Sequence, residues 1–86
     1  MKIESILKNI EKQNKLRREL HLKELALVGS FTYHEKTEYK TFKSFLKDLN
    51  DEYISGFVAT VLDATYNLDE LYIEIDEHTF YIKEVE

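Results

Sequence analysis

Three histidines are the side chains of this 86-residue chain best suited to metal binding or proton transfer: His21, His34 and His78. They lie far apart in the sequence. Neither the H-x-x-x-H nor the H-E-x-x-H spacing, which places two imidazoles on one helix face, occurs. We therefore expect solvated or hydrogen-bonded histidines, no metal site and no cofactor.

Paired carboxylates, the residues of glycosidase-like acid–base chemistry, occur at three places: Asp51-Glu52, Asp69-Glu70 and Asp76-Glu77. Such chemistry needs a cleft that gives the two carboxyl groups different pKa values. A chain with two glycines and no proline has few long loops from which to build that cleft. It also has no cysteine and no glycine-rich phosphate loop. The sequence therefore predicts a protein that is not an enzyme and has no catalytic residues.

Charge is distributed unevenly along the chain. Residues 1–47 hold eleven Lys/Arg against six Asp/Glu, whereas residues 48–86 hold one basic residue, Lys83, against eleven acidic ones. A concentrated negative surface attracts a basic partner, and tyrosines supply the contact area typical of interfaces. The alternative is that these acidic side chains form only a solvated surface and bind no partner. The candidate partner-binding residues are acidic and tyrosine side chains of the second half: Asp63, Asp69, Glu70, Tyr72, Glu74, Asp76, Glu77 and Tyr81.

Hydrophobic periodicity divides the chain into helices and strands. The expected order is helix 2–18, strand 24–33, helix 42–49, helix 52–66 and a β-hairpin over 70–85, with a polar loop over 34–40. Residues 52–66 also have a strand-like composition; a helix is favoured because their polar positions follow the 3.6-residue period.

The hairpin has the clearest pattern. Apolar and polar residues alternate on both sides of a turn near Glu77-His78, as a half-buried hairpin requires. A tight turn there places Ile75 opposite Phe80 and Ile73 opposite Ile82. One face of the hairpin is then apolar and the other is wet.

We expect a single α+β domain over residues 1–86, with three helices packed on a small antiparallel sheet and a C-terminal β-hairpin. The order α-β-α-α-β-β resembles that of winged-helix domains, whose second paired helix reads the major groove. Here that helix would carry Asp51, Glu52 and Asp63, and no basic residue lies between positions 48 and 82. Because DNA binding needs cations at the phosphates, no tight direct binding of duplex DNA is expected.

The composition is similar to that of small acidic proteins of phages and mobile elements, such as DNA-mimic inhibitors and anti-CRISPR proteins. The expected function is non-enzymatic: an inhibitor or regulator that docks an acidic surface on a protein with a basic surface, for example a protein that binds nucleic acid. Two alternatives stay open, a winged-helix-type transcriptional regulator that uses the basic residues of the first helix, and a self-associating structural subunit such as a homodimer.

The sequence also predicts a cytoplasmic location, in the host cytoplasm for a phage protein, and no membrane partner. No apolar run approaches the ~20 residues of a membrane span, and the first residues lack the apolar stretch of a signal peptide.

Overall fold

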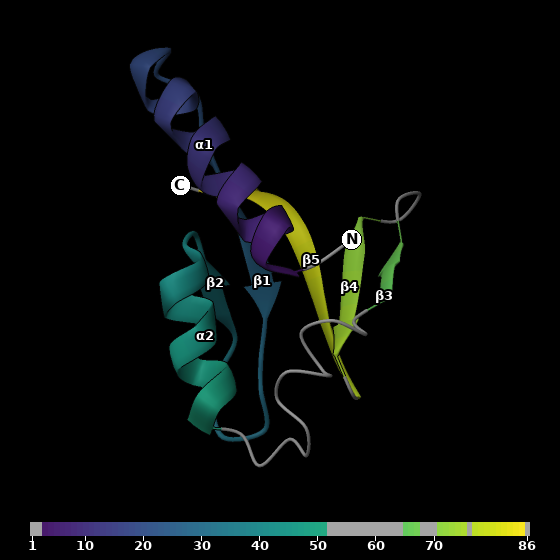
Figure 1. Cartoon of the computed structure of the whole chain (residues 1–86). Helices are drawn as coiled ribbons and strands as arrows, with labels where there is room; N and C mark the ends of the chain where they lie inside the picture. The colour runs from purple at the N-terminus through teal and green to yellow at the C-terminus, as the bar shows by residue number, and fades with distance from the viewer. Residues whose placement is uncertain (1–2, 52–64, 68–70, 76, 86) are drawn as a thin grey trace.

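The computed structural model describes residues 3–51, 65–67, 71–75 and 77–85. These residues form two helices and five strands, in the order α1 (Ile3–Glu19), β1 (Glu24–Gly29), β2 (Thr37–Tyr39), α2 (Phe42–Asp51), β3 (Thr65–Asn67), β4 (Tyr72–Ile75) and β5 (His78–Val85). The strands build one antiparallel sheet in the order β2-β1-β5-β4-β3 (Figure 1). The predicted α+β class is confirmed.

Helix α1 forms where its apolar stripe predicts it. Ile3, Ile6, Leu7 and Ile10 follow the helical repeat, and all four are buried against the sheet. Among the described residues, neither helix combines the length and the apolar character needed to cross a membrane.

The C-terminal end of α1 is closed by a Schellman motif. The Leu22 N–H donates to Arg17 O at 2.8 Å, and the His21 N–H donates to Arg18 O at 3.2 Å. His21 has a φ of 57°, the left-handed conformation that this position requires and that glycine adopts most easily. The imidazole therefore stands where a helix normally has its terminal glycine.

Helix α2 begins at a capping residue. Thr41 Oγ1 accepts the Ser44 backbone N–H at 3.2 Å, and Ser44 Oγ donates back to Thr41 O at 3.0 Å. Phe45 and Leu49 then point into the core. The helix begins where its hydrophobic periodicity predicts it.

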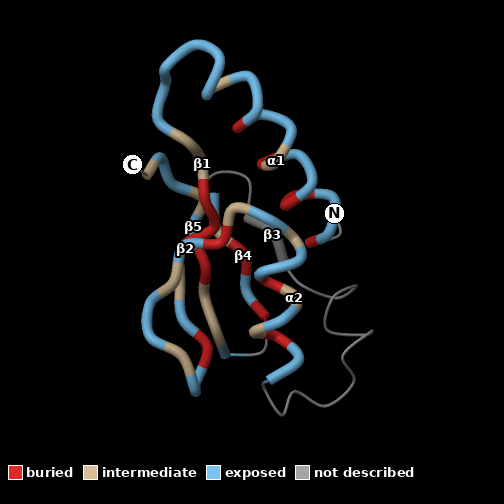
Figure 2. The backbone as a smooth tube through the Cα atoms, turned by 90° about the vertical axis from the view of Figure 1, so that its left-hand side faces the viewer, coloured by how far each residue is buried: buried red, intermediate tan, exposed pale blue. Residues whose placement is uncertain are grey.

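Four aromatic rings pack against one another at the centre of the core. Phe31, Tyr39, Phe45 and Phe80 come from four different segments, and every pair of them has ring centroids 4.8–6.2 Å apart. Gly29 makes room for this cluster, because a Cβ there would overlap the Phe80 ring. The buried residues of the core cluster lie between the sheet and the two helices, where red segments of the two layers face each other in Figure 2.

The first strand is shorter than predicted. It ends at Gly29, because Phe31 leaves the strand to enter the core and the His34 N–H then closes a turn onto Phe31 O at 3.1 Å. The predicted loop 34–40 is also partly wrong. It contains strand β2, which pairs with Leu27, Val28 and Gly29 of β1.

The hairpin β4–β5 has the predicted faces but a different register. Ile73 lies opposite Phe80, and Ile75 lies opposite His78, two residues away from the expected pairing of Ile73 with Ile82. The strands are joined by the two residues between Ile75 and His78, whereas the expected pairing centres the turn on Glu77-His78. A shift of two residues keeps every side chain on its face, so Ile73, Ile75 and Phe80 are buried together.

The prediction of three helices does not match the structure. The third predicted helix is 52–66. Residues 52–64 lie outside the described residues, and Thr65 and Tyr66 belong to strand β3. This strand pairs with β4, so β3, β4 and β5 form a meander. The element order seen in the described residues is therefore not that of a winged helix.

Candidate functional site

The two helices lie on the same side of the sheet (Figures 1 and 2). Helix α1 packs against β1, and α2 contacts β2 and α1. Within the described residues, no helix covers the opposite side, which we call the open face. Because successive strand residues point to opposite sides of a sheet, the open face carries the residues between the core positions: Ala26, Val28, Glu38, Tyr72, Glu74, Thr79, Tyr81 and Lys83.

A tyrosine pair occupies the middle of the open face. Tyr72 and Tyr81 are directly opposite each other in the β4–β5 ladder, and their ring centroids are 5.9 Å apart. The Lys83 ammonium lies 5.6 Å from the centre of the Tyr81 ring, at cation–π distance. Tyr81 keeps 43% of its surface exposed. The pair is thus held in one arrangement while one ring remains available for contact.

The tyrosine pair continues into a row across the sheet. Val28 is opposite Tyr81 on one side and opposite Glu38 on the other. Val28 and Ala26 are buried although they lie outside the core cluster. Their cross-strand partners on β5 are Tyr81 and Lys83. The centre of the open face is therefore apolar and aromatic, and its outer positions are charged.

The structure brings some of the predicted partner-binding residues together. Tyr72, Glu74 and Tyr81 share the open face, and Glu77 is exposed in the turn between β4 and β5. The other predicted residues lie outside the described residues: Asp63, Asp69, Glu70 and Asp76.

Sequence reasoning missed Glu38 as a member of this surface. It lies in the three-residue strand β2, within a segment that looked like a polar loop. The signal for this strand is the change from the exposed Glu38 to the buried Tyr39. A pattern of two residues is too short to identify a strand from the sequence.

No protein-family model, no curated protein and no solved structure matched the chain.

The basic residues at the end of α1 are engaged with the sheet. Arg17 donates to Glu84 Oε1 at 3.1 Å and to Lys23 O at 3.0 Å, and Arg18 pairs with Glu24. A DNA-binding regulator would present these arginines to phosphates. Here they form hydrogen bonds and ion pairs that link α1 to β1 and β5.

Glu24 is the centre of a small ion-pair network. Its carboxylate accepts hydrogen bonds from Lys40 Nζ at 2.9 Å and from Arg18. The Lys40 hydrogen bond, and then the Arg18 hydrogen bond, hold the pKa of Glu24 below its ordinary value, against a smaller opposing effect of burial. The network joins the end of α1, the start of β1 and the segment before α2.

Exposed leucines gather where α1 passes into β1. Leu16, Leu20 and Leu22 keep 54–67% of their surface exposed. A shallow pocket beside them is lined by Arg18, His21, Leu22, Lys23, Glu24 and Val85.

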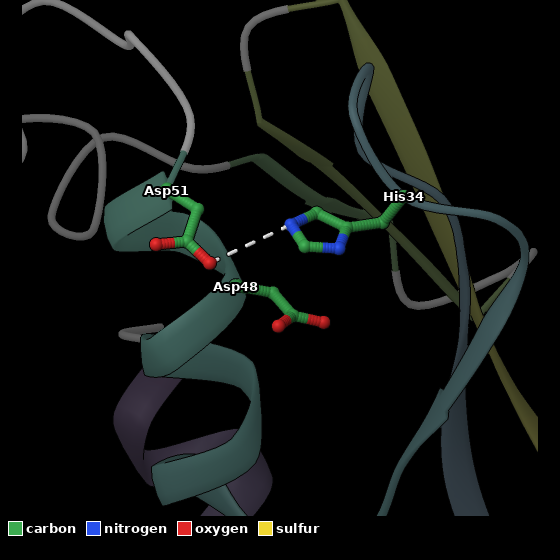
Figure 3. Close-up of side chains that lie close together, drawn as sticks. All are labelled: His34, Asp48 and Asp51. Carbon is green, nitrogen blue, oxygen red and sulfur yellow. Dashed lines mark ion pairs between the residues drawn. The ribbon is translucent and has the colours of Figure 1, made fainter.

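One group of described residues has the donor atoms of a metal site: His34, Asp48 and Asp51. His34 comes from the segment between β1 and β2, and the two aspartates come from the last turns of α2 (Figure 3). Their ligand atoms all lie within 4.8 Å of one another. Figure 3 shows the imidazole facing both carboxylates, with His34 Nε2 3.8 Å from Asp51 Oδ2.

Proposed function

We propose that this protein binds a basic surface of another protein through the open face of hairpin β4–β5. The observation that carries the proposal is the Tyr72–Tyr81 pair, centred on a sheet face that no described helix covers. Aromatic side chains of this kind are the usual anchors of protein interfaces, because they bury a large area with few rotatable bonds.

The charges around the tyrosine pair favour a basic partner. Glu38 and Glu74 are exposed on the open face and Glu77 is exposed in the adjoining turn, whereas Lys83 is the basic residue found there among the described positions. The chain as a whole carries a net charge of −5. Carboxylates at the rim of an apolar centre steer a positively charged partner into place, while the centre supplies the contact area.

A nucleic-acid-binding protein is the concrete partner class. Its basic cleft is shaped to accept negative charges next to flat aromatic bases, and the open face presents carboxylates next to the rings of Tyr72 and Tyr81. Occupation of such a cleft would make the protein an inhibitor or regulator of its partner, as expected of phage or mobile-element proteins of this composition.

Affinity capture with matched tyrosine variants tests the proposal. Wild type, Tyr81→Ala and Tyr33→Ala are immobilised, and the proteins retained from a cell lysate are compared. Tyr33 is 66% exposed and lies outside the open face, so its variant removes a ring that is more accessible than that of Tyr81. Proteins retained by wild type and Tyr33→Ala but lost by Tyr81→Ala support the proposal. The same retained proteins on all three surfaces contradict it.

Self-association is a second candidate function, favoured by the exposed leucines Leu16, Leu20 and Leu22. The pocket beside them is lined by the cationic side chains Arg18 and Lys23 together with His21 and Glu24. The end of α1 and the β4–β5 turn with Glu77 lie at opposite ends of the molecule in Figure 1. The acidic turn of a second copy is therefore the occupant that fits by charge. Sedimentation velocity over a range of concentrations would show association that Leu20→Ser abolishes; a monomer at every concentration would exclude it.

A further inference from the structure

We propose that His34, Asp48 and Asp51 form a binding site for a divalent transition-metal ion, with zinc as the ion that fits best. One imidazole nitrogen and two carboxylate oxygens are zinc ligands, and the mixed nitrogen and oxygen set is unlike the all-oxygen sites of calcium and magnesium. The proposal is independent of the open face, because these three residues lie between α2 and the β1–β2 segment on the helix side of the sheet.

The geometry requires only a small movement to hold a metal. Four ligands at about 2.0–2.2 Å around zinc are separated from one another by roughly 3.3–3.6 Å. His34 Nε2 and Asp51 Oδ2 are already 3.8 Å apart. Asp51 is 58% exposed at the end of α2, so its side chain is able to close the remaining distance. Three protein ligands leave a fourth position for water.

Two observations beyond the clustering point to a cation. The first is that His34 Nε2 is a buried nitrogen with no hydrogen-bond partner among the described residues, and it faces the carboxylates. An unpaired buried polar atom is costly, and a metal bond at Nε2 would remove that cost.

The second observation is the position of the two aspartates on their helix. Asp48 and Asp51 lie at the C-terminal end of α2, where the helix dipole is negative, and the last turn of α2 contains no basic residue. Carboxylates are disfavoured there unless a cation accompanies them. A bound metal ion supplies that positive charge.

Tyr39 acts as a positioning residue for the site. Its hydroxyl donates to Asp48 Oδ2 at 2.6 Å, while its ring is fixed in the aromatic core. The bond orients the Asp48 carboxylate and leaves Oδ1 for the metal, which is the role that outer-shell hydrogen bonds play in metal sites.

Zinc titration of the tag-free protein, followed by calorimetry and by thermal unfolding, tests the proposal. We expect one zinc per chain, a higher unfolding temperature with zinc, and no such response to magnesium. His34→Gln, Asp48→Asn and Asp51→Asn should each weaken zinc binding by more than about tenfold, and Tyr39→Phe should weaken it by roughly tenfold while the metal-free protein stays folded. His21→Asn and Glu19→Gln, which remove an exposed imidazole and an exposed carboxylate elsewhere, should bind as wild type does.

Cobalt gives a second readout that a purely structural role would not produce. Co²⁺ in a site with a nitrogen and two oxygen ligands shows visible absorption bands, which should appear with wild type and be lost with Asp51→Asn, a change at an exposed position. Zinc binding that is unchanged in His34→Gln and Asp51→Asn, or no zinc binding by the wild type, overturns the proposal.

Discussion

The Asn14 side chain on α1 pairs with the backbone of Leu25 on β1 through two hydrogen bonds. Asn14 Nδ2 donates to Leu25 O at 2.8 Å, and Leu25 N–H donates to Asn14 Oδ1 at 2.6 Å. Strand β2 pairs with β1 only from Leu27 to Gly29, so the amide group takes the place of a neighbouring strand at Leu25. Asn14 is only 2% exposed, and it links the helix layer to the sheet.

We predict that Asn14→Ala lowers the free energy of unfolding by about 2–4 kcal/mol, because it leaves two partly buried backbone groups of Leu25 without these partners. Urea denaturation measures the change. Asn9→Ala, at an exposed position of the same helix, is the control and should change stability by less than about 0.5 kcal/mol. Equal effects of the two substitutions would show that the Leu25 pairing is not important for stability.

Replacing the residue at the end of α1 should stabilise the protein. His21 holds a φ of 57°, so His21→Gly relieves backbone strain and should raise the free energy of unfolding by about 0.5–1 kcal/mol after the entropy cost of glycine in the unfolded chain. His21→Ala removes the imidazole without relieving the strain and should give no gain. A stabilisation by alanine as large as that by glycine would contradict the Schellman assignment.

Gly29 should tolerate no larger residue. A Cβ at this position would overlap the Phe80 ring and lie 2.8 Å from Thr79 O, so Gly29→Ala should cost about 1–3 kcal/mol through overpacking. Ser30→Ala, at the exposed next position, should be close to neutral. Thermal unfolding of the two variants distinguishes them, and a neutral Gly29→Ala would mean that the strands β1 and β5 separate easily there.

The Glu24 network should make stability depend on pH in the acid range. The lowered pKa of Glu24 means that this carboxylate binds a proton less readily in the folded state than in the unfolded state. The stabilisation is therefore fully present above the ordinary carboxyl pKa and is lost as pH falls through the lowered one. Wild type should exceed Glu24→Gln in stability at neutral pH, and the difference should vanish in strong acid. A difference that is constant with pH would rule out the network as its source.

The periodic elements of this fold were predictable from the sequence. The apolar stripe of α1, the Thr41 cap of α2 and the alternation of the hairpin each repeat a local rule over several residues. The exact register of β4 on β5 was not predictable, because a shift of two residues leaves the alternation unchanged. In the sequence, Asn14 interrupts the apolar stripe of α1, and no local pattern shows that its side chain pairs with the Leu25 backbone.

The sites differ in how much the sequence reveals of them. Tyr72, Glu74 and Tyr81 were foreseen, because alternation assigns them to the wet face of the hairpin. The cluster of His34 with the α2 aspartates was not foreseen, since its members are brought together by the packing of α2 against the β1–β2 segment and follow no fixed spacing.

Association kinetics with a captured partner test the central claim, that the open face docks on a basic protein surface. Glu74→Lys combined with Glu77→Lys should slow association by about tenfold or more while leaving the fold intact, because exposed charges steer association but contribute little to stability. Glu19→Lys combined with Glu35→Lys changes the net charge equally at exposed positions away from the open face, and should have a much smaller effect. The account predicts that rising salt slows wild-type association and removes the difference between wild type and the Glu74/Glu77 variant. Binding that is independent of salt and unchanged by the Glu74/Glu77 reversal would contradict it.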